Sequence, residues 1–101
     1  MQEVTVDQVA EGGALVLDVR EPAEYVEAHV PGAILIPMGQ VPARIDEIDA
    51  SQTIHVICRS GNRSRTITEL LVGRGFEAHN VIGGTMAWIE SGRPVNTGTT
   101  P

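Results

Sequence analysis

The sequence contains no lysine and only one cysteine, Cys58. All seven basic side chains are arginines, and thirteen acidic side chains outnumber them, which gives a formal net charge of −6. A single cysteine excludes an internal disulfide framework and a zinc site built from several cysteines. The negative charge argues against nucleic-acid and anionic-membrane binding, because such binders gain affinity from clustered positive charge.

Long apolar runs, repeats and low-complexity segments are also missing. No stretch approaches the ~18 apolar residues that suggest a membrane-spanning helix. Residues 1–11 lack the basic start and apolar stretch of a secretory signal, so we expect a cytoplasmic protein whose thiol stays reduced. The 101 residues are 42% hydrophobic, which suffices for one compact domain with its own core. We predict a single domain over residues 1–95 and a flexible C-terminal tail over residues 96–101.

Short apolar segments alternate with amphipathic segments along the chain. The apolar segments, which predict strands, are residues 3–4, 14–18, 33–36, 53–57 and 78–82. The amphipathic segments, which predict helices, are residues 21–28, 41–48, 65–72 and 85–90, with a further helix that begins at Thr5 or Asp7 and ends at Glu11. Strands that alternate with helices favour right-handed crossovers and a mainly parallel sheet.

Cys58 directly follows the predicted strand 53–57, and sites in parallel sheets lie at the carboxyl ends of the strands. Three of the seven arginines, Arg59, Arg63 and Arg65, lie within seven residues of this cysteine. A cysteine attacks as its thiolate, and nearby positive charge and the N-terminus of a helix both lower the pKa of a thiol. The sequence therefore predicts a reactive cysteine at this position.

The segment that follows Cys58 has little side-chain bulk. Gly61 permits unusual backbone conformations, and Ser60 and Asn62 are small or turn-forming. Such a loop can point successive N–H groups inward and hold a thiolate, a persulfide or an oxyanion. The alternative is an inert cysteine buried for packing alone, which a loop this polar and basic disfavours.

Four sequence blocks in this order resemble the single-domain rhodanese family, which includes thiosulfate sulfurtransferases. The blocks are Leu17–Pro22 with Glu24 and Tyr25, His29–Ala33 with Ile36 and Pro37, Cys58–Ser64, and Gly83–Trp88 with Gly92 and Pro94. The resemblance implies a rhodanese-like α/β domain with a five-stranded, mainly parallel sheet flanked by helices on both faces.

The resemblance also implies a reaction. Cys58 would attack the outer sulfur of a small anionic donor such as thiosulfate, release sulfite and carry the sulfur as a persulfide. Cyanide, a thiol or a partner protein would then accept the sulfur. Neither a metal nor an organic cofactor is implied. The loop residues assigned to binding the donor and the persulfide are Arg59, Ser60, Gly61, Asn62, Arg63 and Ser64, with Arg59 and Arg63 as the anion-binding side chains.

A few residues outside the loop are assigned supporting roles. Asp18 ends a predicted strand near the site and resembles a structural carboxylate that ties neighbouring loops together. Arg20 could pair with Glu24 or line the pocket. His29 is interpreted as a structural residue of its loop rather than a general base, and Trp88 as a core anchor.

Two other functions remain as alternatives. A cysteine phosphatase or arsenate reductase has an arginine after the cysteine and five further residues, but here that position is Ser64, and the arginines are at 63 and 65. A non-catalytic rhodanese-like module for binding or regulation would typically lack the cysteine or carry a degraded loop. The sequence leaves open the physiological donor and acceptor, the oligomeric state, any fusion to another domain, and the roles of His29 and Arg65.

Overall fold

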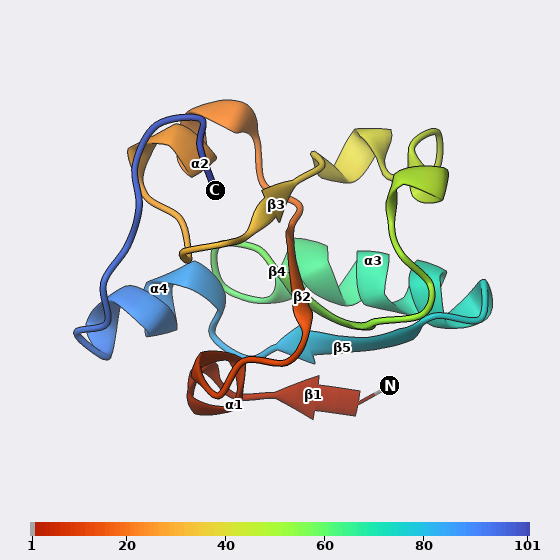
Figure 1. The fold of residues 1–101 in the computed structure, drawn as a ribbon, viewed down its shortest axis with the longest axis horizontal. Coiled ribbons are helices and arrows are strands. Elements are labelled where there is room, and N and C mark those ends of the chain that lie inside the picture. Colours follow the sequence, from red (N-terminus) through yellow and green to blue (C-terminus); the bar gives the residue numbers. More distant parts are fainter. Residues whose placement is uncertain (1) are drawn as a thin grey trace.

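The structure of the protein, a computed structural model, describes residues 2–101, so residue 1 of the predicted domain lies outside the described part. Its strands form one all-parallel sheet with the order β1-β5-β4-β2-β3 (Figure 1). The strands are β1 (Gln2–Val4), β2 (Leu15–Asp18), β3 (Ile34–Leu35), β4 (Thr53–Ile57) and β5 (Glu77–Val81). The predicted five-stranded parallel sheet is confirmed, and β4 has the predicted bounds.

Helices cover both faces of this sheet, also as predicted. The α-helices are α1 (Val6–Ala10), α2 (Pro22–Glu27), α3 (Asn62–Gly73) and α4 (Gly84–Glu90), and the short 3₁₀ helices are η1 (Met38–Gln40) and η2 (Ile45–Glu47). Thr5 caps α1, because its side chain accepts a hydrogen bond from the N–H of Gln8 and the Gln8 side chain accepts one from the N–H of Thr5. Within residues 2–101, no helix is long and apolar enough to cross a membrane.

The helix predicted over 41–48 is present only in part. Residues 41–44 form turns, and η2 (Ile45–Glu47) is a single 3₁₀ turn rather than an α-helix. Arg44, with φ −112° and ψ 16°, leaves the α-helical region, so the turns and η2 do not join into one helix.

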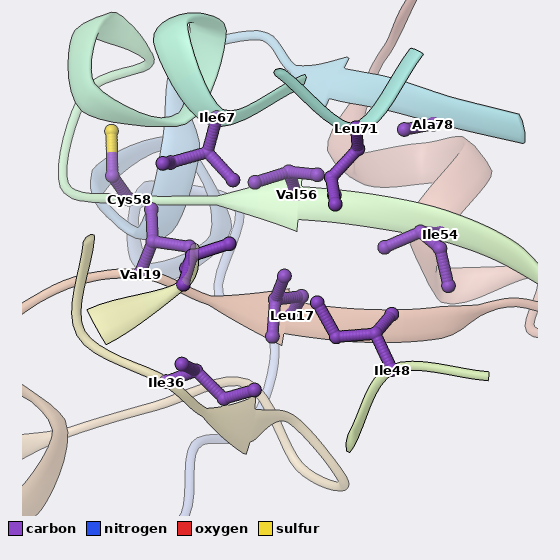
Figure 2. Packing of buried hydrophobic residues seen from close by; sticks show 11 residues of the cluster. Leu17, Val19, Ile36, Ile48, Ile54, Val56, Cys58, Ile67, Leu71 and Ala78 are labelled. Carbon is purple, nitrogen blue, oxygen red and sulfur yellow. The ribbon is translucent and has the colours of Figure 1, made fainter. Parts of the chain in front are cut away.

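Two apolar clusters lie on opposite faces of the sheet. On one face, α3, η1 and η2 cover a cluster in which Ile67 and Leu71 contact the β4 face that bears Ile54 and Val56 (Figure 2). On the other face, α1, α2 and α4 contribute to a second cluster, in which Trp88 is buried, so its predicted role as a core anchor is confirmed. Full burial of a side chain such as Leu71 contributes roughly 2 kcal/mol. The two clusters enclose β4, the central strand of the sheet, and Cys58 follows its carboxyl end.

The residues after α4 return to α2. His29 and Asn96 form an antiparallel bridge with two N–H···O hydrogen bonds of 2.9 Å, and the N–H of Gly98 donates to the carbonyl of Val26. The His29 ring stacks on Tyr25 with centroids 3.7 Å apart, and its Nε2 lies 2.9 Å from the carbonyl oxygen of residue 100. His29 therefore links α2 to the C-terminal segment, whose predicted flexibility stays a prediction.

Candidate active site

Cys58 lies one residue beyond the end of β4, at the carboxyl edge of the sheet. β2 and β4 run in register there, with Asp18 beside Ile57. Cys58 is only 1% exposed, and Figure 2 shows its Sγ at the end of the apolar cluster, pointing toward the chain turn that begins α3. The sulfur therefore faces the loop rather than the core.

The loop from Cys58 to α3 wraps around this sulfur. Gly61 precedes α3 with φ 111°, a conformation that side chains disfavour, and its N–H donates to Sγ over 3.2 Å. The hydroxyl oxygen of Ser64, in the first turn of α3, lies 3.2 Å from the same Sγ. The loop thus brings hydrogen-bond donors and the N-terminal end of a helix to one sulfur atom.

These contacts lower the pKa of Cys58 below its ordinary value. Burial acts first and raises the pKa, but hydrogen bonds from the Ser64 hydroxyl and from the N–H groups of Ser64, Gly61 and Ser60 outweigh it. The lowered pKa predicted from the sequence is therefore reproduced. Its causes are the donors of the loop, whereas the sequence had also pointed to the arginine side chains.

A buried asparagine on β5 supports this loop from behind. Asn80 is 1% exposed, and its Oδ1 accepts a hydrogen bond of 2.5 Å from the Ser64 hydroxyl. Its Nδ2 donates to the Gly61 carbonyl over 3.2 Å. Asn80 therefore positions both of the loop residues that touch Sγ. The sequence offered one signal for this role, a polar side chain at a buried position of a strand.

The N-terminus of α4 holds the other side of the loop. The N–H and the hydroxyl of Thr85 both donate to the Cys58 carbonyl, over 2.9 and 3.0 Å, and the N–H of Met86 donates to the Arg59 carbonyl over 3.0 Å. Gly84 permits this approach, because a Cβ at this position would lie 2.5 Å from the Cys58 carbonyl oxygen. Gly84, the first residue of α4, therefore allows a close contact between two backbones.

The three arginines near Cys58 have different partners. Arg63 forms a bidentate ion pair with Glu24 of α2, with N···O distances of 2.7 and 2.9 Å. This pair holds the pKa of Glu24 at about 2, chiefly through the hydrogen bonds from Arg63. Arg65 lies 3.6 Å from Glu3 on β1. Arg59 forms no ion pair within residues 2–101.

Asp18 and Arg20 form a buried pair beside the loop. Asp18 accepts hydrogen bonds from the backbone N–H and the guanidinium of Arg20, with a shortest distance of 2.8 Å. Arg20 also donates to the Ala28 carbonyl over 2.8 Å. Of the two options left by the sequence, Arg20 lines the pocket, and its ionic partner is Asp18 rather than Glu24.

An open pocket of about 330 Å³ is lined by Arg59, the residue that follows Cys58, whereas Cys58 itself does not line it. Arg20, Glu24 and Arg59 supply charged groups to its wall. The remaining lining residues are Glu27, Ala28, Thr85, Met86 and Ile89. Within residues 2–101, no three histidine, cysteine or carboxylate side chains come together in a way that could hold a metal ion.

Of the loop residues selected from the sequence, Ser60, Gly61 and Ser64 contact the Cys58 sulfur. Arg63 and Arg20 instead pair with carboxylates.

Sequence reasoning did not connect Glu24, Asn80 and Thr85 with the site. Glu24 and Thr85 stand in two of the sequence blocks quoted above. Neither predicted a role at the site, because an acidic residue in a first turn and a threonine at a helix start are common features of helices.

Comparisons with known proteins agree with this fold. The family profile described as rhodanese-like domain matches residues 2–91. The protein YtwF of Bacillus subtilis is 40% identical, over 79% of this chain and 78% of YtwF. The thiosulfate sulfurtransferase GlpE of Pseudomonas syringae is 33% identical, over 77% of this chain and 74% of GlpE. A crystal structure of a rhodanese-related protein from Thermoplasma volcanium superposes with a TM-score of 0.92 at 32% identity, covering 95% of this chain and 98% of that chain.

Proposed function

The chain belongs to the rhodanese-like domain family, and on that premise we propose that it is a sulfurtransferase that moves sulfane sulfur through a persulfide on Cys58. The donor is a small anionic sulfur compound, for which thiosulfate is the first test compound. The acceptor is cyanide, a thiol or a partner protein. The observation that carries the proposal is the pair of contacts to Sγ, from the N–H of Gly61 and the hydroxyl oxygen of Ser64, each at 3.2 Å.

The reaction follows from these contacts in two steps. The Cys58 thiolate attacks the outer sulfur of thiosulfate, and the S–S bond breaks with its electron pair leaving on sulfite. The new persulfide is negatively charged, and the N–H groups that lower the pKa of Cys58 stabilise it in the same way. An acceptor nucleophile then attacks the terminal sulfur and regenerates the Cys58 thiolate.

Buried side chains hold the loop around Cys58 in this arrangement. Asn80 and Thr85 fix the loop from opposite sides, and the Asp18–Arg20 pair supports the adjacent wall of the pocket. Arg59 extends a positive charge toward an anionic donor. A cytoplasmic location, as expected from the sequence, would keep the thiol reduced.

Steady-state transfer from thiosulfate to cyanide tests the proposal. We expect thiocyanate to form, and Cys58→Ser to abolish it, because a serine hydroxyl cannot carry a sulfane sulfur. The proposal is wrong if the wild-type protein transfers no sulfur from thiosulfate or from any other sulfane donor. A parallel assay with an aryl phosphate examines the phosphatase alternative, and we expect no hydrolysis that depends on Cys58.

A further inference from the structure

The orientation of the buried Asn80 amide is fixed by the groups around it. Its Nδ2 faces two groups that only accept hydrogen bonds, the Gly61 carbonyl at 3.2 Å and a Glu3 carboxylate oxygen at 3.5 Å. An amide turned the other way would place Oδ1 against these acceptors, where no hydrogen bond can form. Oδ1 therefore faces Ser64, whose hydroxyl donates to it over 2.5 Å.

This oxygen of Asn80 and the Cys58 sulfur depend on the same proton. Within residues 2–101, Oδ1 has no hydrogen-bond donor other than the Ser64 hydroxyl, which also lies 3.2 Å from Sγ. Asn80 is 1% exposed and Ser64 is 0% exposed, so bulk water does not supply a second donor. When Sγ takes the hydroxyl proton, Oδ1 is left buried and unpaired, which costs free energy.

This competition acts differently on the two forms of Cys58 in the proposed reaction. The free thiolate carries its negative charge on Sγ, where the Ser64 hydroxyl stabilises it and leaves Oδ1 of Asn80 unpaired. In the persulfide, Sγ is bonded to a second sulfur, and the charge lies on that outer atom. The hydroxyl then returns to Oδ1, so no buried acceptor loses its donor. Asn80 therefore opposes the free thiolate more than the persulfide.

From this geometry, and resting on the proposed sulfurtransferase function, we propose that Asn80 is a positioning residue that favours the sulfur-loaded form of Cys58 over the free thiolate. It acts through Ser64, whose hydroxyl it holds away from Sγ whenever Sγ is uncharged. In loading, Sγ bonds to the outer sulfur of thiosulfate, and the S–S bond breaks with its electron pair on sulfite. Sulfite reverses the step when it bonds to the outer sulfur and Sγ leaves with the electron pair as a thiolate.

The loading equilibrium measures this preference directly. Intact mass gives the fraction of protein that carries one extra sulfur at fixed ratios of thiosulfate to sulfite, at a pH where free Cys58 is fully ionised. We expect Asn80→Leu, a side chain of similar shape without an acceptor, to lower the loading constant about fivefold. The thiolate of this variant keeps the Ser64 hydroxyl without leaving a buried oxygen unpaired. An unchanged loading constant overturns the proposal.

A double-mutant cycle separates this role from a purely structural one. Asn80→Leu also removes the hydrogen bond from Nδ2 to the Gly61 carbonyl, and this loss is the same with or without the Ser64 hydroxyl. In the Ser64→Ala background we therefore expect Asn80→Leu to change the loading constant less than about twofold. Equal fold-changes in the two backgrounds would show that Asn80 only supports the loop, and they would overturn the proposal.

Thr68→Val is the matched control on α3. Thr68 is fully buried, and its hydroxyl donates to the Ser64 carbonyl over 2.7 Å, so the variant removes a hydrogen bond to Ser64 without affecting the Ser64 hydroxyl. We expect it to change the loading constant less than about twofold. Asn80→Ala replaces Asn80→Leu if leucine does not fit on β5, and its loading constant should fall in the same way. A fall in Thr68→Val as large as in the Asn80 variant would overturn the specific role of Asn80.

The pH profile of Cys58 alkylation by iodoacetamide tests the competition without a sulfur donor. We expect the fold-change that Asn80→Leu causes in the acid dissociation constant of the Cys58 thiol to be about fivefold larger in the wild-type background than in Ser64→Ala. Equal fold-changes overturn the proposal. If the wild type loads sulfur but all variants share its loading constant, the role of Asn80 alone fails. If the wild type loads sulfur from no sulfane donor, the sulfurtransferase function fails, and this inference fails with it.

Discussion

Ser64 has a single hydroxyl proton and two neighbours that can accept it, the Cys58 sulfur and the Asn80 side-chain oxygen. Asn80 accepts this proton over 2.5 Å, and Sγ lies 3.2 Å from the same hydroxyl oxygen. A neutral Cys58 can donate to Ser64 while Ser64 donates to Asn80. When Cys58 is a thiolate, the hydroxyl of Ser64 can rotate and donate to Sγ instead. Ser64 and Asn80 thus accommodate both protonation states of Cys58.

We expect Ser64→Ala to raise the pKa of Cys58 by about one unit, because a hydrogen bond to a charged group contributes about 1.5 kcal/mol. The thiolate fraction at neutral pH falls as a result, and alkylation by iodoacetamide slows. The pH dependence of the alkylation rate measures the change. Ser60 acts on Cys58 through its N–H rather than its hydroxyl, so Ser60→Ala is the matched control and should leave the pKa in place. An unchanged alkylation profile in Ser64→Ala would contradict this interpretation.

At the scale of secondary-structure elements, the site depends on how closely α4 approaches the loop. Gly84 has φ 57°, and a Cβ there would lie 2.5 and 2.6 Å from the carbonyl oxygens of Cys58 and Arg59. Such distances force the helix and the loop apart. The hydrogen bonds from Thr85 to Cys58 would then lengthen or break.

We expect Gly84→Ala to lower the free energy of unfolding by about 3 kcal/mol, since it combines backbone strain with a clash between two backbones. Gly75→Ala is the control, because Gly75 also has positive φ, at 90°, but has no neighbour within 4 Å of the added Cβ. It should cost about 1 kcal/mol. Denaturant unfolding measures both values, and equal losses would show that the contact with the loop is unimportant.

Most elements and the position of Cys58 were predictable from the sequence, but the partners of the charged side chains were not. A continuous apolar run located β4, which is buried along almost its whole length, and helical periodicity located α3. The same periodicity overstated the helix at residues 41–48, where Arg44 leaves the α-helical region and only a 3₁₀ turn forms. The pairing of Arg63 with Glu24 joins residues 39 apart in the chain, and no local pattern encodes it.

At the scale of the whole molecule, the ion pair between Glu24 and Arg63 links α2 to the start of α3, and it makes stability depend on pH. The pKa of Glu24 is about 2 in the folded protein against an ordinary value of 4.5, mainly because of Arg63. The unfolded chain therefore binds this proton first as the pH falls. The stabilisation is present above pH 4.5 and is lost as the pH falls toward 2.

We expect Glu24→Gln to be less stable than the wild type at pH 7, by about 1 kcal/mol because both side chains are partly exposed to solvent. The difference should shrink as the pH falls below about 4.5 and vanish near pH 2. Denaturant unfolding at several pH values measures it. A stability difference that is the same at pH 7 and near pH 2 would contradict the assignment of the shift to this pair.

The C-terminal segment closes the molecule against α2. The N–H groups of Asn96 and Gly98 donate to the carbonyls of His29 and Val26. We expect these two amides to exchange with solvent at least about tenfold more slowly than the amide of Thr99, which forms no backbone hydrogen bond within the described residues. Exchange of all three amides at the rate of an unstructured peptide would support the flexible tail predicted from the sequence.

The proposed function requires that Cys58 carry the transferred sulfur. Intact mass measured after incubation with thiosulfate, and separately with methanethiosulfonate, detects that sulfur. We expect the protein to gain the mass of one sulfur atom, cyanide to remove it, and Cys58→Ser never to acquire it. A wild-type protein whose mass stays unchanged with every sulfane donor, or a Cys58→Ser variant that gains the sulfur equally, would show that Cys58 is not the carrier.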